Sequence, residues 1–146
     1  MSMKIKNVRH TGIVTDNLSK SLKFYRDLLG FKIKRRMVEK GSTTDALSGF
    51  KKTKVETVKL ISPDKNSMIE LLNYKSPTSK KKYYGVSRVG ISHMAFSVYD
   101  LKKTYKKLLK KKIYFKCEPK LSADGKVILT FCRAPEGTWI ELVQEI

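Results

Sequence analysis

The chain has 146 residues, of which 40% are hydrophobic, a length that suits one ordinary domain or two small modules sharing a core. No apolar run is long enough to span a bilayer, and residues 1–6 lack the apolar stretch of a secretory signal. We therefore expect a cytoplasmic protein with no membrane partner. The two cysteines, Cys117 and Cys132, fit no metal-ligand spacing, and we expect half-buried, reduced thiols.

The net charge of +19 is the strongest anomaly of the composition, and it comes from 26 Lys but only 6 Arg. Nucleic-acid-binding proteins usually use arginine to contact bases, and here the lysines are spread along the whole chain. The simplest interpretation is a solvated lysine-rich surface. Electrostatic steering of an anionic small-molecule substrate is the second, and nucleic-acid binding is a distant third, so we predict no nucleic-acid partner.

In the first half, apolar alternation and β-branched residues predict strands at 5–14, 31–38, 55–61 and 67–73. Helical spacing of apolar residues predicts a helix from Leu18 to Leu29, which Asp16 or Asn17 can cap and Gly30 can end. Residues 40–54 are polar and contain glycine, and we expect a loop there with a short turn near Ala46.

A polar, lysine-rich connector at 75–87 is predicted to separate the two halves. In the second half, strands are predicted at 89–98, 113–117, 126–132 and 138–144, with a loop at 119–125. A helix beginning at Leu101 is predicted to be capped by Asp100. Both halves therefore have the order βαβββ, which indicates a duplicated fold. The extra length of the first half falls in residues 40–54.

The chain has only two histidines, and each occupies the same place in the repeat. His10 and His93 lie on the first predicted strand of their halves, and Glu70 and Glu141 lie on the last, each between Ile and Leu. The residues two positions after the histidines, Gly12 and Ala95, are small and leave room for a ligand. A carboxylate among apolar neighbours is costly unless it is paired or bound to a metal.

Taken singly, a strand histidine is more often a hydrogen-bonded core residue, and an inward glutamate more often a member of an ion pair. All four in matching positions favour a metal site. Two imidazoles and two carboxylates suit one divalent transition ion, such as Zn²⁺, Ni²⁺, Co²⁺, Mn²⁺ or Fe²⁺. We therefore predict His10, Glu70, His93 and Glu141 as metal ligands, with two positions left for a bidentate substrate.

Two segments carry a family resemblance: Val8–Val14, and Ser21–Phe31 with the pattern Ser-x-x-Phe-Tyr-x-x-x-Leu-Gly-Phe. They resemble the vicinal oxygen chelate superfamily, which includes glyoxalase I, methylmalonyl-CoA epimerase, extradiol dioxygenases, and the fosfomycin and bleomycin resistance proteins. The resemblance covers nearly the whole chain and implies an α+β fold, with two tandem βαβββ modules forming a curved mixed sheet around one metal site. We predict a single glyoxalase-like domain at 1–146, made of module 1 (5–74) and module 2 (88–146).

The ligand order His, Glu, His, Glu is similar to that of bacterial glyoxalase I. Epimerases usually carry Gln where this chain has Glu70, extradiol and fosfomycin enzymes use two His and one Glu, and antibiotic-binding members generally lack the ligands. The resemblance thus implies a lyase or isomerase of the lactoylglutathione lyase type, which moves a proton next to a carbonyl through a metal-chelated enediolate. It implies Glu141 as the catalytic base, with pseudo-symmetric Glu70 as the second choice.

Glyoxalase I is expected to carry an arginine shortly after its first ligand to hold the glutathione carboxylate, but here the sequence is Gly12-Ile13-Val14. A CoA thioester, or another 2-oxo or 2-hydroxy acid derivative, is therefore as suitable a substrate as a glutathione adduct. Two alternatives stay open, an Fe(II) extradiol-type dioxygenase and a non-catalytic small-molecule or antibiotic-binding protein. The family also implies a homodimer, with the site either within one chain or shared between two.

Overall fold

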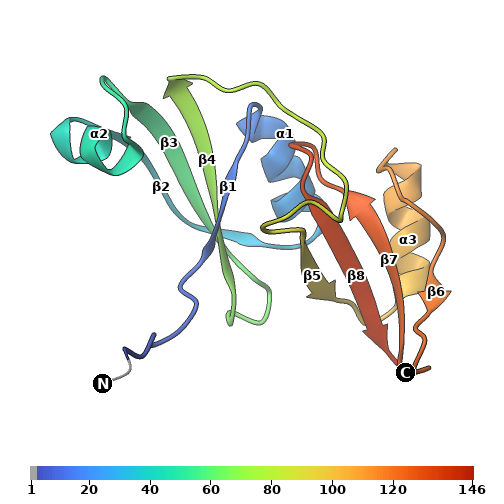
Figure 1. The fold of residues 1–146 in the computed structure, drawn as a ribbon. Coiled ribbons are helices and arrows are strands. Elements are labelled where there is room, and N and C mark those ends of the chain that lie inside the picture. The colour runs from blue at the N-terminus through green and yellow to red at the C-terminus, as the bar shows by residue number, and fades with distance from the viewer. Residues whose placement is uncertain (1–2) are drawn as a thin grey trace. The chain divides into compact units, whose positions relative to one another are not determined.

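The computed structural model describes residues 3–146, so Met1 and Ser2 of the segment predicted to lack a signal lie outside the described range. The chain divides into two compact units, Met1–Lys81 and Lys82–Ile146, and each forms one four-stranded mixed sheet (Figure 1). The predicted α+β class is confirmed. The single-domain organisation and its module bounds stay predictions. Within the described residues, no helix combines the length and apolar character needed to cross a bilayer.

Unit 1 contains β1 (Thr11–Val14), α1 (Leu18–Leu22), η1 (Lys23–Leu28), β2 (Lys32–Lys40), α2 (Ser42–Ser48), β3 (Lys54–Ile61) and β4 (Met68–Ser76). The sheet order is β1-β4-β3-β2, with β1 parallel to β4 and the other pairs antiparallel. Strand side chains alternate between faces. On β4, Ile69 and Leu71 are buried in the core with Phe24 and Tyr25, so Glu70 points to the opposite face.

Unit 2 repeats this plan with β5 (His93–Ser97), α3 (Leu101–Lys110), β6 (Lys120–Leu121), β7 (Val127–Arg133) and β8 (Trp139–Glu145). The sheet order is β5-β8-β7-β6, and β5 is parallel to β8. The buried core includes Leu101 and Leu108 of α3 with Ile140 and Leu142 of β8. Glu141 therefore points away from α3.

The first strand of each unit is shorter than predicted. Only Thr11–Val14 of the predicted strand 5–14 forms β1, and only His93–Ser97 of 89–98 forms β5. Pairing begins near the start of the partner strand: Thr11 pairs with Ile69, the second residue of β4, and His93 with Trp139, the first of β8. Among the described residues, those before Thr11 and His93 pair with no strand, so His10 lies directly before β1 rather than in it.

The predicted helix 18–29 is present, but it continues after α1 as a π-helix, η1. The capping predictions are confirmed, because Asn17 Oδ1 accepts the Lys20 N–H at 3.0 Å and Asp100 Oδ1 accepts the Lys103 N–H at 2.8 Å. The loop predicted at 40–54 was wrong in part, because it contains α2. The Asp45 carboxylate of α2 accepts the N–H groups of Lys52 and Thr53, and the Thr53 N–H holds the pKa of Asp45 below its usual value.

The strand predicted at 113–117 is reduced to a single bridge between Phe115 and Cys132, and the edge strand β6 forms instead within the predicted loop 119–125. The two cysteines are free thiols, as predicted, but neither is half-buried: Cys117 is exposed and Cys132 is buried. Burial raises the pKa of the Cys132 thiol to about 12, which keeps it protonated and unreactive at neutral pH.

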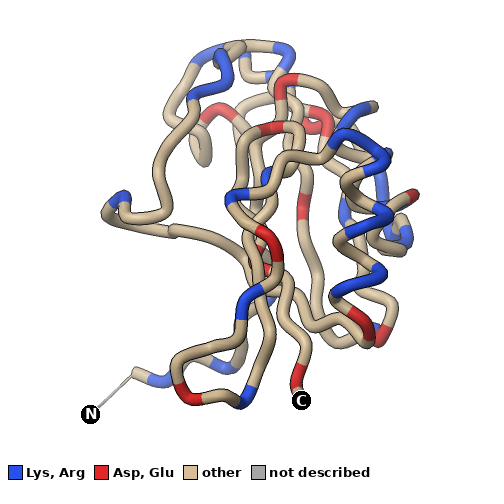
Figure 2. Tube along the Cα trace, turned by 90° about the vertical axis from the view of Figure 1, so that its right-hand side faces the viewer, with Lys and Arg blue, Asp and Glu red and all other residues tan. Residues whose placement is uncertain are grey.

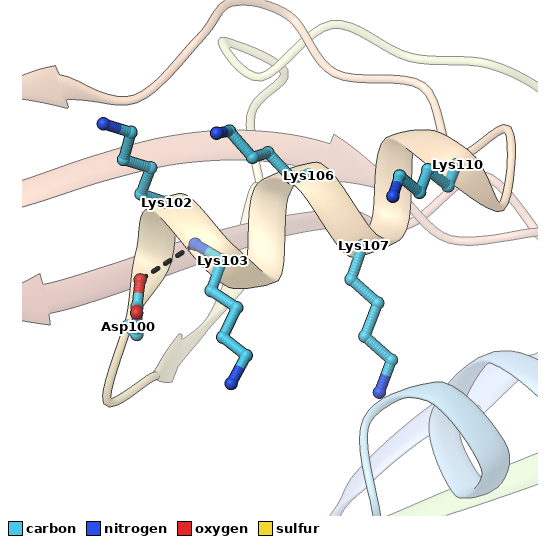
Figure 3. A pocket seen from close by; sticks show the side chains of 6 residues that line it. All are labelled: Asp100, Lys102, Lys103, Lys106, Lys107 and Lys110. Carbon is cyan, nitrogen blue, oxygen red and sulfur yellow. Dashed lines mark hydrogen bonds between the residues drawn. The ribbon is translucent and has the colours of Figure 1, made fainter.

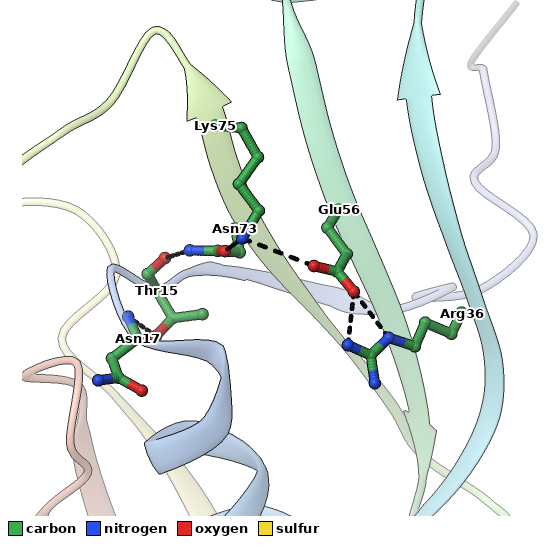
Figure 4. A network of polar contacts seen from close by, with 6 residues as sticks. All are labelled: Thr15, Asn17, Arg36, Glu56, Asn73 and Lys75. Carbon is green, nitrogen blue, oxygen red and sulfur yellow. Dashed lines mark hydrogen bonds and ion pairs between the residues drawn. The ribbon is translucent and has the colours of Figure 1, made fainter.

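A polar network ties the four strands of unit 1 together (Figure 4). Asn73 Nδ2 donates at 2.8 Å to the carbonyl oxygen of Thr15, the residue that follows β1. Lys75 bonds to Asn73 Oδ1 and lies 3.6 Å from Glu56, which accepts the Arg36 guanidinium at 2.7 Å. The Arg36 hydrogen bond holds the pKa of Glu56 below its usual value. The network fixes the chain at Thr15, directly after the C-terminal end of β1.

Candidate metal centre

The first predicted ligand pair comes together at β1 and β4. Gly12 is paired in register with Glu70, which brings His10 and Glu70 to neighbouring positions. His10 Nε2 lies 3.8 Å from Glu70 Oε1, and the two side chains are 27% and 14% exposed. A Cβ at Gly12 would lie 3.3 Å from Leu72 Cδ1, so the absent side chain lets Leu72 pack closely beside the pair.

The second pair comes together at β5 and β8, where Ala95 is paired in register with Glu141. His93 Nε2 lies 3.0 Å from Glu141 Oε2, and the side chains are 34% and 18% exposed. The edge of the Phe131 ring packs against the His93 imidazole with centroids 5.0 Å apart. Each unit therefore holds one histidine and one mostly buried glutamate in contact, as the repeat predicts.

A lysine that sequence reasoning missed accompanies the first pair. Lys59 on β3 is paired in register with Glu70, and its Nζ lies 3.5 Å from Glu70 Oε2. Phe131 holds the corresponding register position opposite Glu141. Glu70 thus has a fixed cationic partner, whereas Glu141 has an aromatic neighbour. The sequence does not reveal that Lys59 lies opposite Glu70, because the register between β3 and β4 is set by the turn that joins them.

The donor atoms of these pairs fit a divalent transition ion, because imidazole nitrogen and carboxylate oxygen are its usual protein ligands. In unit 2 the tautomer is also favourable. Ser92 Oγ donates to the Val86 carbonyl, so at 2.9 Å it accepts from His93 Nδ1, and this leaves the Nε2 lone pair for a metal. In unit 1, His10 Nδ1 is buried and has no hydrogen-bond partner among the described residues.

Each unit supplies two donors. Among residues 3–146, no group of three or more His, Cys, Asp or Glu side chains has a spacing that could hold a metal ion. The four-ligand site therefore stays a prediction, while the pairing within each unit is a feature of the fold.

A hollow of about 490 Å³ continues along the same face of unit 1. Leu72 and Tyr74, which follow Glu70 by two and four residues on β4, line one side of it, and Leu47 of α2 lines another. The insertion at 40–54 thus forms one wall of a partly apolar hollow whose lining includes Leu72, the side chain that packs next to Gly12.

A second hollow, of about 500 Å³, is lined by Asp100 and five lysines of α3, namely Lys102, Lys103, Lys106, Lys107 and Lys110 (Figure 3). It lies on the helix side of the sheet in unit 2, opposite Glu141, and offers no donor set for a metal. Basic residues are distributed over both units, with a run along this helix (Figure 2). The lysines of α3 are a solvated surface, in line with the simplest interpretation of the charge.

Comparison with known proteins identifies the family. The glyoxalase/bleomycin resistance protein/dioxygenase superfamily matches residues 7–142, so the chain belongs to this superfamily and the predicted resemblance is confirmed. A probable lactoylglutathione lyase of Synechocystis sp. is 32% identical over 136 residues, which are 92% of each protein.

Two further matches are informative. Glyoxalase I of Saccharomyces cerevisiae is 27% identical over 146 residues, which are 93% of this chain and 44% of the yeast protein. The crystal structure of a glyoxalase family protein from Bacillus cereus superimposes with a TM-score of 0.89 at 23% identity, covering 99% of this chain and 97% of that one. At this identity the structural match establishes the fold alone.

Proposed function

We propose that this chain is a metal-dependent enzyme of the glyoxalase or epimerase type, which transfers a proton at a carbon next to a carbonyl group. One observation carries the proposal: in each unit a histidine Nε2 faces a glutamate carboxylate, at 3.8 Å and 3.0 Å, and the carboxylates are only 14% and 18% exposed. Membership of the superfamily supports it, as do the names of two relatives, a probable lactoylglutathione lyase and a glyoxalase I.

His10, Glu70, His93 and Glu141 are the proposed ligands of one divalent ion. When bound, such an ion supplies Lewis-acid stabilisation of the negative charge that develops on two substrate oxygens. Glu141 is the proposed catalytic base, which takes the proton from carbon and returns it to the same or the neighbouring carbon. The lysine beside Glu70 supports this choice, because its ammonium group lies 3.5 Å from Glu70 Oε2, whereas no lysine or arginine of the described residues forms an ion pair with Glu141.

For the substrate we propose a small compound with two neighbouring oxygens, either a thioester or thiol adduct, or a 2-oxo or 2-hydroxy acid derivative. The partly apolar hollow beside Glu70 suits the remainder of such a molecule. We further propose a cytoplasmic homodimer, the arrangement common in the family, which light scattering of the purified protein would measure directly.

The test is deuterium incorporation from D₂O at the carbon next to the carbonyl, followed by NMR under argon. Candidate substrates are the methylglyoxal–glutathione hemithioacetal and methylmalonyl-CoA, and the protein is used as isolated, after chelation, and after addition of Zn²⁺, Ni²⁺, Co²⁺ or Mn²⁺. We expect incorporation that chelation abolishes and at least one ion restores, with about one ion per chain by elemental analysis.

Three results would contradict this proposal. Incorporation that survives complete chelation would exclude the metal. Turnover that needs O₂ and Fe²⁺ would identify a dioxygenase instead. Tight ligand binding that survives chelation and leads to no turnover would identify a binding protein.

A further inference from the structure

Unit 2 carries a cluster of cations and aromatic rings that the proposed chemistry does not use. We call it the Arg133 cluster; it consists of Arg133, Lys116, Trp139, Tyr83 and Tyr114. The Arg133 guanidinium carbon lies 3.9 Å from the centre of the Trp139 ring, 4.7 Å from that of Tyr83 and 5.9 Å from that of Tyr114. The Lys116 ammonium lies 4.5 Å over the same Trp139 ring.

The two cations of this cluster lack an anion. No carboxylate of residues 3–146 forms an ion pair with Arg133 or Lys116. Arg133 Nε is buried with no hydrogen-bond partner in the described part of the chain, although Nη2 donates to the Tyr84 carbonyl at 3.3 Å. The ring contacts accept no N–H in the guanidinium plane. Because Nε is covered by the protein itself, an outside anion would be met by the terminal guanidinium nitrogens and by the exposed Lys116 ammonium.

The position of the cluster relates it to the second ligand pair. On the sheet, Trp139 is paired in register with Arg133 on one side and with His93 on the other, and the three strands lie side by side (Figure 1). Glu141 follows Trp139 by two residues and points to the same face, at a spacing of about 7 Å along the strand. The cationic cluster therefore flanks the His93–Glu141 pair.

We propose that the Arg133 cluster binds an anionic group of the substrate, a carboxylate or a phosphate, a few bonds away from the oxygens that react beside His93 and Glu141. This inference rests on the proposed function for its location but not for the binding of the anion. Arg133 offers its terminal guanidinium N–H groups to the anion, and Lys116 adds a point charge. The substrate class is thereby narrowed to oxo or hydroxy compounds with a second negative charge.

The test uses Trp139, the single tryptophan of the chain, as a fluorescent reporter. The protein is titrated with inorganic phosphate and, separately, with glutarate, against chloride at the same ionic strength. The variants are Arg133→Gln and Lys116→Gln, with Lys103→Gln as a matched control, because Lys103 is an exposed lysine on α3, on the other face of the sheet.

We expect saturable binding of at least one anion that Arg133→Gln weakens by about tenfold or more, as for a lost charge-assisted hydrogen bond. Lys116→Gln should weaken it about threefold and Lys103→Gln not measurably. The anion that binds more tightly distinguishes a phosphate from a carboxylate. If Arg133→Gln does not fold, the titration of Lys116→Gln tests the inference instead, because Lys116 is exposed. Absence of saturable binding, or equal weakening by Lys116→Gln and Lys103→Gln, would overturn the inference.

The titration is repeated after chelation, with metal content measured for every variant. Anion binding by a protein that takes up none of the added divalent ions would retain this inference and contradict the proposed function. Metal-dependent deuterium incorporation without anion binding would support the proposed function and overturn this inference.

Discussion

The two units place the same donor atoms on the same kind of sheet but surround them differently. In unit 1, His10 and Glu70 stand 3.8 Å apart, Lys59 lies 3.5 Å from the carboxylate, and His10 Nδ1 has no partner among the described residues. In unit 2, His93 and Glu141 stand 3.0 Å apart, and Ser92 holds His93 Nδ1.

The difference shows how two copies of one module can keep the same donor atoms and still give them different neighbours. Both units contain the histidine–glutamate pair. In unit 1 the Lys59 ammonium group lies beside the carboxylate, whereas in unit 2 the Phe131 ring packs against the imidazole and Ser92 Oγ bonds to its Nδ1. The Lys59 ammonium occupies one oxygen of Glu70, and no lysine or arginine of the described residues does so at Glu141, so Glu141 is the better placed of the two proposed bases. Four predictions test the comparison.

Glu141→Gln should lower the rate of deuterium incorporation by about 10²–10⁴-fold, the usual contribution of a positioned base. Glu70→Gln should have a smaller effect, because an amide oxygen can still act as a ligand. Rates are compared per bound ion, with metal content measured on the same samples. An unchanged rate in Glu141→Gln, or a larger loss in Glu70→Gln, would reverse the assignment of the base.

Lys59→Met should tighten binding of a divalent ion about fivefold, because removing one unit charge near the site removes roughly 1 kcal/mol of repulsion at high dielectric. Phe131→Lys should weaken binding by a similar factor, since it places a cation opposite Glu141. Competition with a metal-sensitive dye measures both. Lys54→Met, on the same strand but exposed, is the control and should leave the affinity unchanged.

The helix caps allow the two units to be compared by the free energy of unfolding that is lost when each cap is removed. Asp100→Ala should lower the free energy of unfolding by about 1 kcal/mol, since it removes the acceptor for the Lys103 N–H. Asn17→Ala should cost somewhat less, because the neutral amide makes no charge–dipole contribution. Urea denaturation measures both, with Asp16→Ala as a near-neutral control. A larger loss of stability for Asp16→Ala than for Asn17→Ala would show that Asp16, and not Asn17, caps the helix.

The smallest effect concerns the polar network of unit 1. The pKa of Glu56 is held below its usual value by Arg36, so its stabilisation is present above the unfolded pKa of about 4.5 and is lost as pH falls through the folded value. Glu56→Gln should cost about 0.5 kcal/mol at pH 7. Thermal melts from pH 7 to pH 3 should show the difference from the wild type disappear on the acid side. A constant difference would assign the effect to packing.

The sequence by itself determined the repeat, the α+β class, both helix caps and the pairing of each histidine with its own glutamate. These features depend on local periodicity and on which side of a strand a residue faces, which the order of apolar and polar residues encodes. The family followed from the same residues, because Ser21–Phe31 includes the buried Phe24, Tyr25 and Phe31.

Only the tertiary structure decided the surroundings of the pairs. Lys59 and Phe131 stand opposite the two glutamates because of strand register, and Lys116 and Arg133 meet over Trp139 although they lie on different segments. The starts of β1 and β5 were likewise set by partner strands distant in sequence, whereas α2 is held by Asp45, which accepts the N–H groups of Lys52 and Thr53. Contacts between segments depend on register and packing, which local patterns do not specify.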